Sequence, residues 1–274
     1  MTNIKITLTR AVLVLFLSFS LQAKEDISVT VYGDGYYPPF SWQQDGRFVG
    51  IYPTILRNAF DRMDGYDIKI VPVPWKRGLH ILKYGKAFAL FPPYYHPKTR
   101  PYMSYSVPIL EEKTRLVCHK DFFGKSRERW PEDFYGASIG RSLGYLIGGE
   151  SFQEAIEQKK IKVIELQDSN HNLMLMVGNG RIDCYVDEAS ALEVELNYLK
   201  ASLEYKTLAE NIFMGPIVNH QRGYLGFTNE NLDMYPYKND FVNKFNQIIL
   251  DMQNSGDIER VINESLKAYQ EDLK

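Results

Sequence analysis

The chain has 274 residues, of which 24% are charged, and its 32 basic and 34 acidic side chains give a formal net charge of −2. No basic cluster with interleaved aromatic residues occurs, so neither the charge nor its pattern points to nucleic acid. The length suffices for one large domain or for two medium lobes, each with its own hydrophobic core.

The first 23 residues have the pattern of a secretory signal peptide. Lys5 and Arg10 precede an apolar run at residues 11–21, and the small residue Ala23 lies just before Lys24. The run is shorter than the roughly 20 apolar residues of a membrane span. We therefore expect cleavage after Ala23 and a soluble mature protein. No cysteine lies near this position, which argues against a lipid anchor.

Strands and helices are expected to alternate through the next part of the chain. The expected elements are a strand at 27–32, a turn-rich stretch at 33–40, a helix at 52–63, a strand at 67–73, a short helix at 79–82 and a strand at 87–91. Helical spacing of the apolar residues gives the first helix one buried face. The alternation predicts an α/β unit with a mainly parallel sheet covered on both faces.

A second run of the same kind follows. It has strands at 135–139, 161–166 and 181–186 and helices at 151–158 and 170–178, and helices at 239–254 and 257–269 close the chain. Two successive α/β units predict two lobes.

The two cysteines, Cys118 and Cys184, both lie in apolar, strand-like stretches. In an oxidising compartment they could form a disulfide. A buried free thiol is the commoner outcome at such positions, and we expect free thiols. Their spacing is not that of zinc ligands, and the sequence predicts no cofactor.

Several short motifs occur in a fixed order over most of the mature chain. They are Asp34-Gly-Tyr-Tyr37-Pro-Pro-Phe40, a polar hairpin with Gly46 and Gly50, Val73-Pro-Trp75-Lys-Arg77, Arg100 followed by Tyr105-Ser106-Val-Pro108, and Gly180-Arg-Ile-Asp183 followed by Asp187-Glu188. In order and spacing they resemble the bacterial extracellular solute-binding proteins of amino-acid-type ABC importers, family 3.

The resemblance implies a two-lobed type II periplasmic-binding-protein fold with two crossing hinge strands. Lobe 1 would comprise residues 24–118 and lobe 2 residues 119–224, and residues 225–274 would return to lobe 1. The crossings would fall near residues 116–120 and 224–227. The implied function is capture of a small polar, carboxylate-bearing, amino-acid-like molecule by lobe closure. A monomer in the periplasm would then deliver it to an ABC permease in the inner membrane.

Candidate ligand-binding residues follow from chemistry and from their place in the motifs. The guanidinium of Arg100 matches a carboxylate, and the carboxylate of Asp187 suits an ammonium group. The alignment of this acidic motif with the family is uncertain by one residue, so Glu188 is the alternative to Asp187. The other candidates are Asp34, the aromatic residues Tyr37, Trp75 and Tyr95, and the turn from Ser142 to Gly144, whose backbone N–H groups could hold an anion.

The chain departs from the family pattern just before Arg100. Members that bind α-amino acids carry small residues where this chain has Pro93, Tyr94 and Tyr95. Proline has no N–H to donate, and tyrosine narrows the space. These differences disfavour a standard α-amino acid as the ligand.

Two other functional classes remain open. The same scaffold hosts periplasmic dehydratases, for which Glu111, Glu112, Asp187 and Glu188 are candidate acids, although no acid–base pair of recognisable spacing stands out. A freely diffusing sensor that docks on a membrane receptor is the second alternative. Neighbouring permease or histidine kinase genes would separate transport from sensing.

Overall fold

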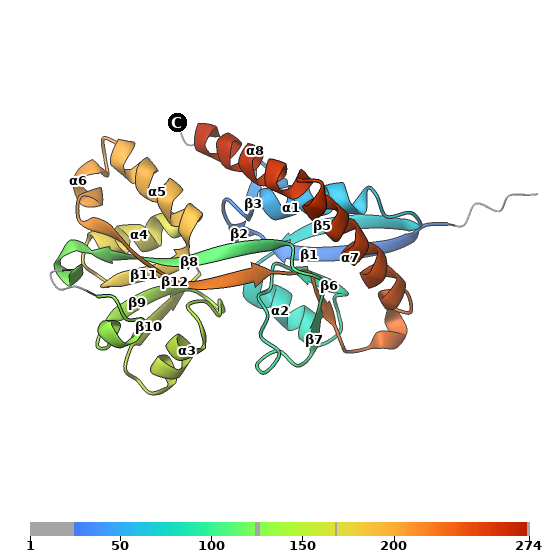
Figure 1. Ribbon diagram of the computed structural model, residues 1–274, viewed down its shortest axis with the longest axis horizontal. Helices are drawn as coiled ribbons and strands as arrows, with labels where there is room; N and C mark the ends of the chain where they lie inside the picture. The colour runs from blue at the N-terminus through green and yellow to red at the C-terminus, as the bar shows by residue number, and fades with distance from the viewer. Residues whose placement is uncertain (1–24, 124–126, 168, 273–274) are drawn as a thin grey trace, which may run out of the picture.

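The computed structural model describes residues 25–123, 127–167 and 169–272. The predicted signal peptide lies outside these residues, so its cleavage stays a prediction. The described chain forms two α/β lobes joined by two long strands (Figure 1). No helix in the described ranges is long and apolar enough to cross a membrane.

The first lobe is built on a five-stranded sheet in the order β5-β1-β6-β13-β7. Its strands are β1 (Ile27–Asp34), β5 (Tyr66–Val73), β6 (Ala89–Phe91), β7 (Met103–Tyr105) and β13 (Gly226–Thr228). Strands β5, β1 and β6 are parallel, as the alternation of strands and helices predicts, and β13 runs antiparallel to β6 and β7. A three-stranded hairpin sheet lies beside it, formed by β2 (Tyr36–Tyr37), β3 (Ser41–Gln44) and β4 (Arg47–Val49).

Helices cover the first sheet. They are α1 (Ile51–Phe60), α2 (Trp75–Lys83), α7 (Lys238–Asn254) and α8 (Asp257–Asp272), with a short 3-10 helix at Leu232–Met234. The apolar face of α1 packs on the C-terminal helices, because the ring of Phe60 contacts Phe241 and Phe245 of α7. The described part of the chain therefore ends on the lobe in which it begins.

The second lobe has a five-stranded sheet in the order β10-β9-β11-β8-β12. Its strands are β8 (Leu110–His119), β9 (Ser138–Ser142), β10 (Lys162–Leu166), β11 (Cys184–Glu188) and β12 (Ile212–Gly223). Its helices are α3 (Glu150–Glu157), α4 (Asn170–Gly178), α5 (Ala189–Ala201) and α6 (Lys206–Ala209), with 3-10 helices at Lys120–Phe123 and Glu132–Phe134. The lobe has its own apolar core around Phe134 and Phe152.

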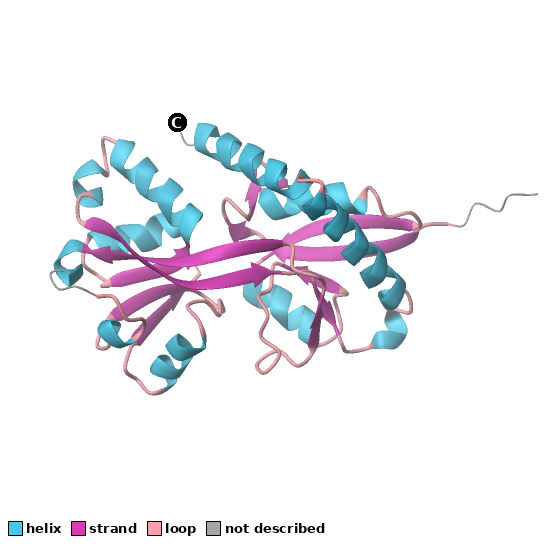
Figure 2. Ribbon diagram, in the orientation of Figure 1, coloured by secondary structure: helices cyan, strands magenta, loops and turns pink. Residues whose placement is uncertain are grey.

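The two lobes are joined by β8 and β12, an antiparallel pair that runs from one lobe into the other (Figure 2). Residues 116–120, where we placed the first crossing, pair largely with β11 inside the second sheet, and β8 begins at Leu110. The boundary that we predicted at residue 118 is therefore several residues late. The cause is that β8 is one unbroken ten-residue strand, so no turn marks the point at which the chain changes lobe.

The prediction of free thiols is wrong in this structure, where Cys118 and Cys184 form a disulfide. Both residues are fully buried, as expected. They lie directly opposite each other on the antiparallel strands β8 and β11. This strand pairing decides the outcome, and it cannot be read from two apolar stretches 66 residues apart.

Candidate functional site

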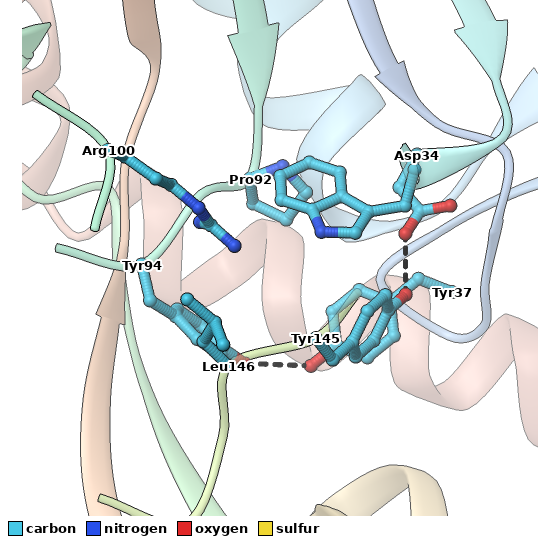
Figure 3. A pocket seen from close by; sticks show the side chains of 8 residues that line it. Asp34, Tyr37, Pro92, Tyr94, Arg100, Tyr145 and Leu146 are labelled. Carbon is cyan, nitrogen blue, oxygen red and sulfur yellow. Dashed lines mark hydrogen bonds between the residues drawn. The ribbon is translucent and has the colours of Figure 1, made fainter. Parts of the chain in front are cut away.

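A small pocket lies between the lobes at the carboxyl ends of several strands. It is lined by Asp34, Tyr37, Trp75, Pro92, Tyr94 and Arg100 from the first lobe and by Tyr145 and Leu146 from the second (Figure 3). Asp34 ends β1, Trp75 begins α2 just after β5, and Tyr145 follows β9. Loops at the carboxyl ends of strands are where open α/β sheets bind ligands. The structure thus brings four of the predicted site residues, Asp34, Tyr37, Trp75 and Arg100, to one pocket.

Arg100 supplies a buried positive charge in this pocket. Its residue exposure is 4%, and its guanidinium carbon lies 5.6 Å from the centre of the Trp75 ring. Desolvation lowers the pKa of Arg100, although an arginine stays protonated in a protein. In the described part of the chain no carboxylate forms an ion pair with it, and its side chain donates to the carbonyl oxygen of Gly144 at 3.5 Å. A buried guanidinium without an anionic partner is chemically suited to pair with an anion.

The carbonyl oxygen of Gly144, in the second lobe, accepts hydrogen bonds from two side chains of the first lobe. Besides that of Arg100, this is the side chain of Trp75, whose indole N–H donates at 3.3 Å. The backbone φ of Gly144 is +81°, a conformation that glycine adopts without strain. The predicted turn from Ser142 to Gly144 therefore reaches the cleft, where Ser142 lines a small pocket beside Asp34 and Trp75. The contact in the structure is made by a carbonyl, however, and not by the backbone N–H groups that we expected to hold an anion.

Two buried carboxyl groups, from opposite lobes, interact across the cleft. Asp34 accepts hydrogen bonds from the Tyr36 N–H at 3.0 Å and from the Tyr145 hydroxyl at 2.5 Å. Asp187, on β11, accepts from the Tyr185 hydroxyl and from the Glu188 N–H. The pKa of each carboxyl is raised to about 7, mainly by burial, and the charge of Asp187 contributes to the raised value of Asp34. Such a pair is suited to a cationic group, which would favour ionisation of both.

The choice between Asp187 and Glu188 becomes clearer from their partners. Glu188 is the N-cap of α5, and its carboxylate accepts hydrogen bonds from the backbone N–H groups of Ser190 and Ala191. Burial, together with the nearby charge of Glu112, raises its pKa to about 7. Capping accounts for the position of Glu188. Asp187 caps no helix, which makes it the better candidate of the two, but neither residue lines the pocket around Arg100.

Tyr95 lies outside the pocket, contrary to our expectation. Its exposure is 60%, and its ring packs against Tyr105 and Tyr224 beside a wider groove on the surface. The preceding residue, Tyr94, lines the pocket instead. Successive side chains of an extended segment point in opposite directions, so a shift of one residue exchanges the inward and outward positions.

Sequence reasoning did not select Tyr145, although this residue fills the centre of the site. Its ring makes edge contacts with Tyr37 and Trp75, at 5.5 and 6.2 Å between ring centres. The available signal was a tyrosine in a glycine-rich loop between a predicted strand and helix. Glu112 was considered only as an acid for catalysis, yet it binds three tyrosine hydroxyls behind the pocket.

The lobes are closed on each other around this site. His96 Nε2 lies 2.9 Å from the Leu146 carbonyl oxygen, and the ammonium of Lys98 lies 2.9 Å from the carboxylate of Glu150. The pocket around Arg100 measures about 20 Å³, close to the space that a single water requires, whereas the wider groove beside it, lined by residues of both lobes, measures about 810 Å³. A ligand of amino-acid size can therefore enter the pocket around Arg100 only when the lobes separate or Tyr145 moves. Within the described ranges, no three His, Cys, Asp or Glu side chains are grouped as metal ligands.

Comparison with family models identifies one match, to the bacterial extracellular solute-binding proteins, family 3, over residues 29–267. No curated protein matches the chain.

Three similar solved structures belong to proteins with different functions. The first, from a study of glutathione import via GshT and the cystine ABC importer TcyBC of Streptococcus mutans, has a TM-score of 0.69 at 19% identity and covers 88% of this chain and 95% of its own. A histidine kinase sensor domain similar to periplasmic binding proteins has a TM-score of 0.69 at 15% identity, with coverages of 88% and 97%. The ancestral amino-acid-binding protein AncCDT-1, a precursor of cyclohexadienyl dehydratase, has a TM-score of 0.62 at 19% identity, with coverages of 87% and 95%. At these identities the likeness shows a shared fold, which by itself does not decide function.

Proposed function

The chain belongs to the bacterial extracellular solute-binding proteins, family 3, and on that premise we propose that it captures a small carboxylate-bearing, amino-acid-like solute between its lobes. The protein acts in the periplasm as a monomer and delivers this solute to an ABC importer in the inner membrane. Neither nucleic acid nor a cofactor takes part.

The observation that carries this proposal is the buried guanidinium of Arg100. Among the described residues it has no ion-pair partner, and it lies in a pocket to which both lobes contribute. A ligand carboxylate would supply the missing charge, and lobe closure would remove both charges from water together. Asp187 on the opposite lobe would receive the ligand's ammonium group.

With a ligand bound, the lobes would close on it with the same surfaces that contact each other in this structure. The two connecting strands allow a hinge motion, since β8 and β12 are the paired segments that pass between the lobes. The contacts of Tyr145 and Leu146 with the first lobe would be replaced by contacts with the ligand. A transport protein of this kind needs no chemical step.

A thermal-shift screen of the mature chain tests the proposal. The compounds are amino acids, amines, dicarboxylates and short peptides, and a ligand at about 100 times its dissociation constant adds about 2.7 kcal/mol to the free energy of unfolding. We expect a carboxylate-bearing solute to raise the melting temperature and to be recovered unchanged after incubation. Recovery of a converted compound would instead favour a dehydratase, and a screen in which only compounds without a carboxylate bind would overturn the assignment of Arg100.

A further inference from the structure

Glu112 lies on β8 at the point where the chain leaves the first lobe, and its exposure is 2%. The hydroxyls of Tyr37 and Tyr94 both donate to its Oε2, each at 2.6 Å, and the hydroxyl of Tyr52 donates to its Oε1. No Lys, Arg or His among the described residues forms an ion pair with this carboxylate. The three tyrosines are therefore its partners.

The backbone opposite Glu112 is shaped to permit this arrangement. A Cβ atom at Gly223, which pairs with Leu110 on the neighbouring strand, would lie 1.7 Å from the Tyr52 hydroxyl and 3.0 Å from Glu112 Oε1. Any other residue at this position would push Tyr52 away from the carboxylate. The cluster thus depends on close approach of the β12 backbone.

The direction of these hydrogen bonds determines what the pocket offers to a ligand. A tyrosine hydroxyl has one hydrogen, and its oxygen can also accept. Burial and the charge of Glu112 raise the pKa values of all three tyrosines, so the hydroxyls stay neutral. The hydroxyl oxygens of Tyr37 and Tyr94 also lie within hydrogen-bond distance of each other, at 3.1 Å (Figure 3). Each lies closer to Glu112, at 2.6 Å, so we assign both hydrogens to the carboxylate, which leaves lone pairs on two oxygens at the pocket wall.

The same wall carries Asp34, whose Oδ2 accepts from Tyr145 only because the lobes are closed on each other. When the second lobe moves away, this wall presents three acceptor oxygens, those of Asp34, Tyr37 and Tyr94. The donors in the same pocket, Arg100 and the Trp75 indole, both point to the carbonyl oxygen of Gly144. The pocket therefore offers donors at that carbonyl and acceptors at this wall.

On the premise that the ligand binds in this pocket, we propose that Glu112 is a specificity-determining residue: by holding the hydroxyl hydrogens of Tyr37 and Tyr94, it makes the pocket wall a hydrogen-bond acceptor. The wall then selects a ligand with an ammonium or guanidinium group there, in addition to the carboxylate that Arg100 receives. A carbonyl or carboxylate group at this wall would face oxygen lone pairs and would be rejected.

Calorimetry with amino acids of similar length tests this selection. The probes are L-lysine and L-arginine, which carry a terminal cation, L-norleucine, which has the chain length of lysine without the cation, and L-glutamate. For the wild type we expect L-lysine or L-arginine to bind at least about tenfold more tightly than L-norleucine, because hydrogen bonds to charged groups are the stronger class.

Glu112→Gln replaces an acceptor with an amide that also donates, so at least one tyrosine hydrogen is released toward the pocket. The preference for the cationic probes should fall by about tenfold or more, with a smaller change for L-norleucine. Tyr94→Phe removes one acceptor and keeps the ring, so it should also lower the affinity for the cationic probes relative to L-norleucine. This variant replaces Glu112→Gln in the test if Glu112→Gln does not fold. Glu259→Gln, the same change at an exposed position on α8, should leave the ratio unaltered.

Each result separates this inference from the proposed function. A wild type that prefers L-glutamate or L-norleucine, or folded Glu112→Gln and Tyr94→Phe variants that keep the wild-type ratio, overturns the role of Glu112 and leaves the pocket as the binding site. Failure of all four probes to bind overturns the cation preference, and failure of every carboxylate in the wider screen overturns the proposed function as well.

Discussion

The hydroxyl of Tyr145 in the second lobe donates a 2.5 Å hydrogen bond to the carboxylate of Asp34 in the first lobe. The two residues are 111 positions apart in the sequence, and their contact closes the cleft over the pocket. A ligand must break this contact before it can reach Asp34. The hydrogen bond therefore competes with binding.

Removing that hydrogen bond should strengthen ligand binding. Tyr145→Phe keeps the ring between Tyr37 and Trp75 but loses the donor, so the closed form without ligand is stabilised less. A net loss of about 1 kcal/mol in that form would tighten binding by about fivefold. Calorimetry with a ligand from the screen measures this change, and Tyr135→Phe, at an exposed tyrosine, is the control. Weaker binding by Tyr145→Phe would show that the hydroxyl contacts the ligand.

The buried carboxyls predict how stability depends on pH. Burial raises the pKa values of Asp34, Asp187 and Glu188 to about 7. Between about pH 4 and pH 7 the folded protein then holds protons that the unfolded chain has lost, so the free energy of unfolding falls as pH rises through this window. Each group contributes a slope of up to about 1.4 kcal/mol per pH unit.

Scanning calorimetry of the ligand-free protein should therefore show a melting temperature that decreases from about pH 4 to about pH 7. Asp34→Asn removes one of the titrating groups and should make the dependence less steep. A melting temperature that is constant or increases over this range would contradict the raised pKa values.

The disulfide between Cys118 and Cys184 should contribute substantially to stability. It closes a loop between residues 66 positions apart, for which the chain-entropy description gives about 4 kcal/mol. Cys118→Ala combined with Cys184→Ala should lower the midpoint of guanidinium unfolding without changing the fold. Thiol titration of the denatured wild-type protein should find no free thiol, and two reactive thiols would support the original expectation of unpaired cysteines.

Much of the fold was predictable because its signals are local. Apolar runs and helical spacing placed α4 at its observed bounds, residues 170–178, and placed β1 and α7 to within a few residues. Strand β12 was missed, because an edge strand with alternating exposure and a glycine-proline pair carries little apolar signal. Helix α5 was missed because it follows β11 without an intervening turn.

The residues of the site also fall into two groups, those that local motifs predict and those that only the tertiary fold brings together. The position of Arg100 and Asp34 at the pocket was predictable because each lies in a short motif of fixed local spacing. The roles of Glu112 and Tyr145 depend on segments that only the tertiary fold brings together, since Tyr37 and Glu112 are 75 positions apart. Sequence alone also could not distinguish Tyr94 from Tyr95, because one residue of register decides which side chain points inward.

The last prediction concerns Arg100, whose charge is buried without an anionic partner among the described residues. Arg100→Ala should weaken binding of a carboxylate ligand by about 30-fold to several thousandfold, because truncating one partner of a desolvated charge pair costs about 2–5 kcal/mol. Arg100→Lys should recover only part of this affinity, since an ammonium group lacks the planar guanidinium fork. Asp187→Asn should have a comparable effect only if the ligand also carries an ammonium group. Calorimetry on these variants, with the exposed Arg47→Ala as control, therefore reports the ligand's charge pattern. Binding by Arg100→Ala within about threefold of wild type, a loss below about 1 kcal/mol, would remove Arg100 from the binding site.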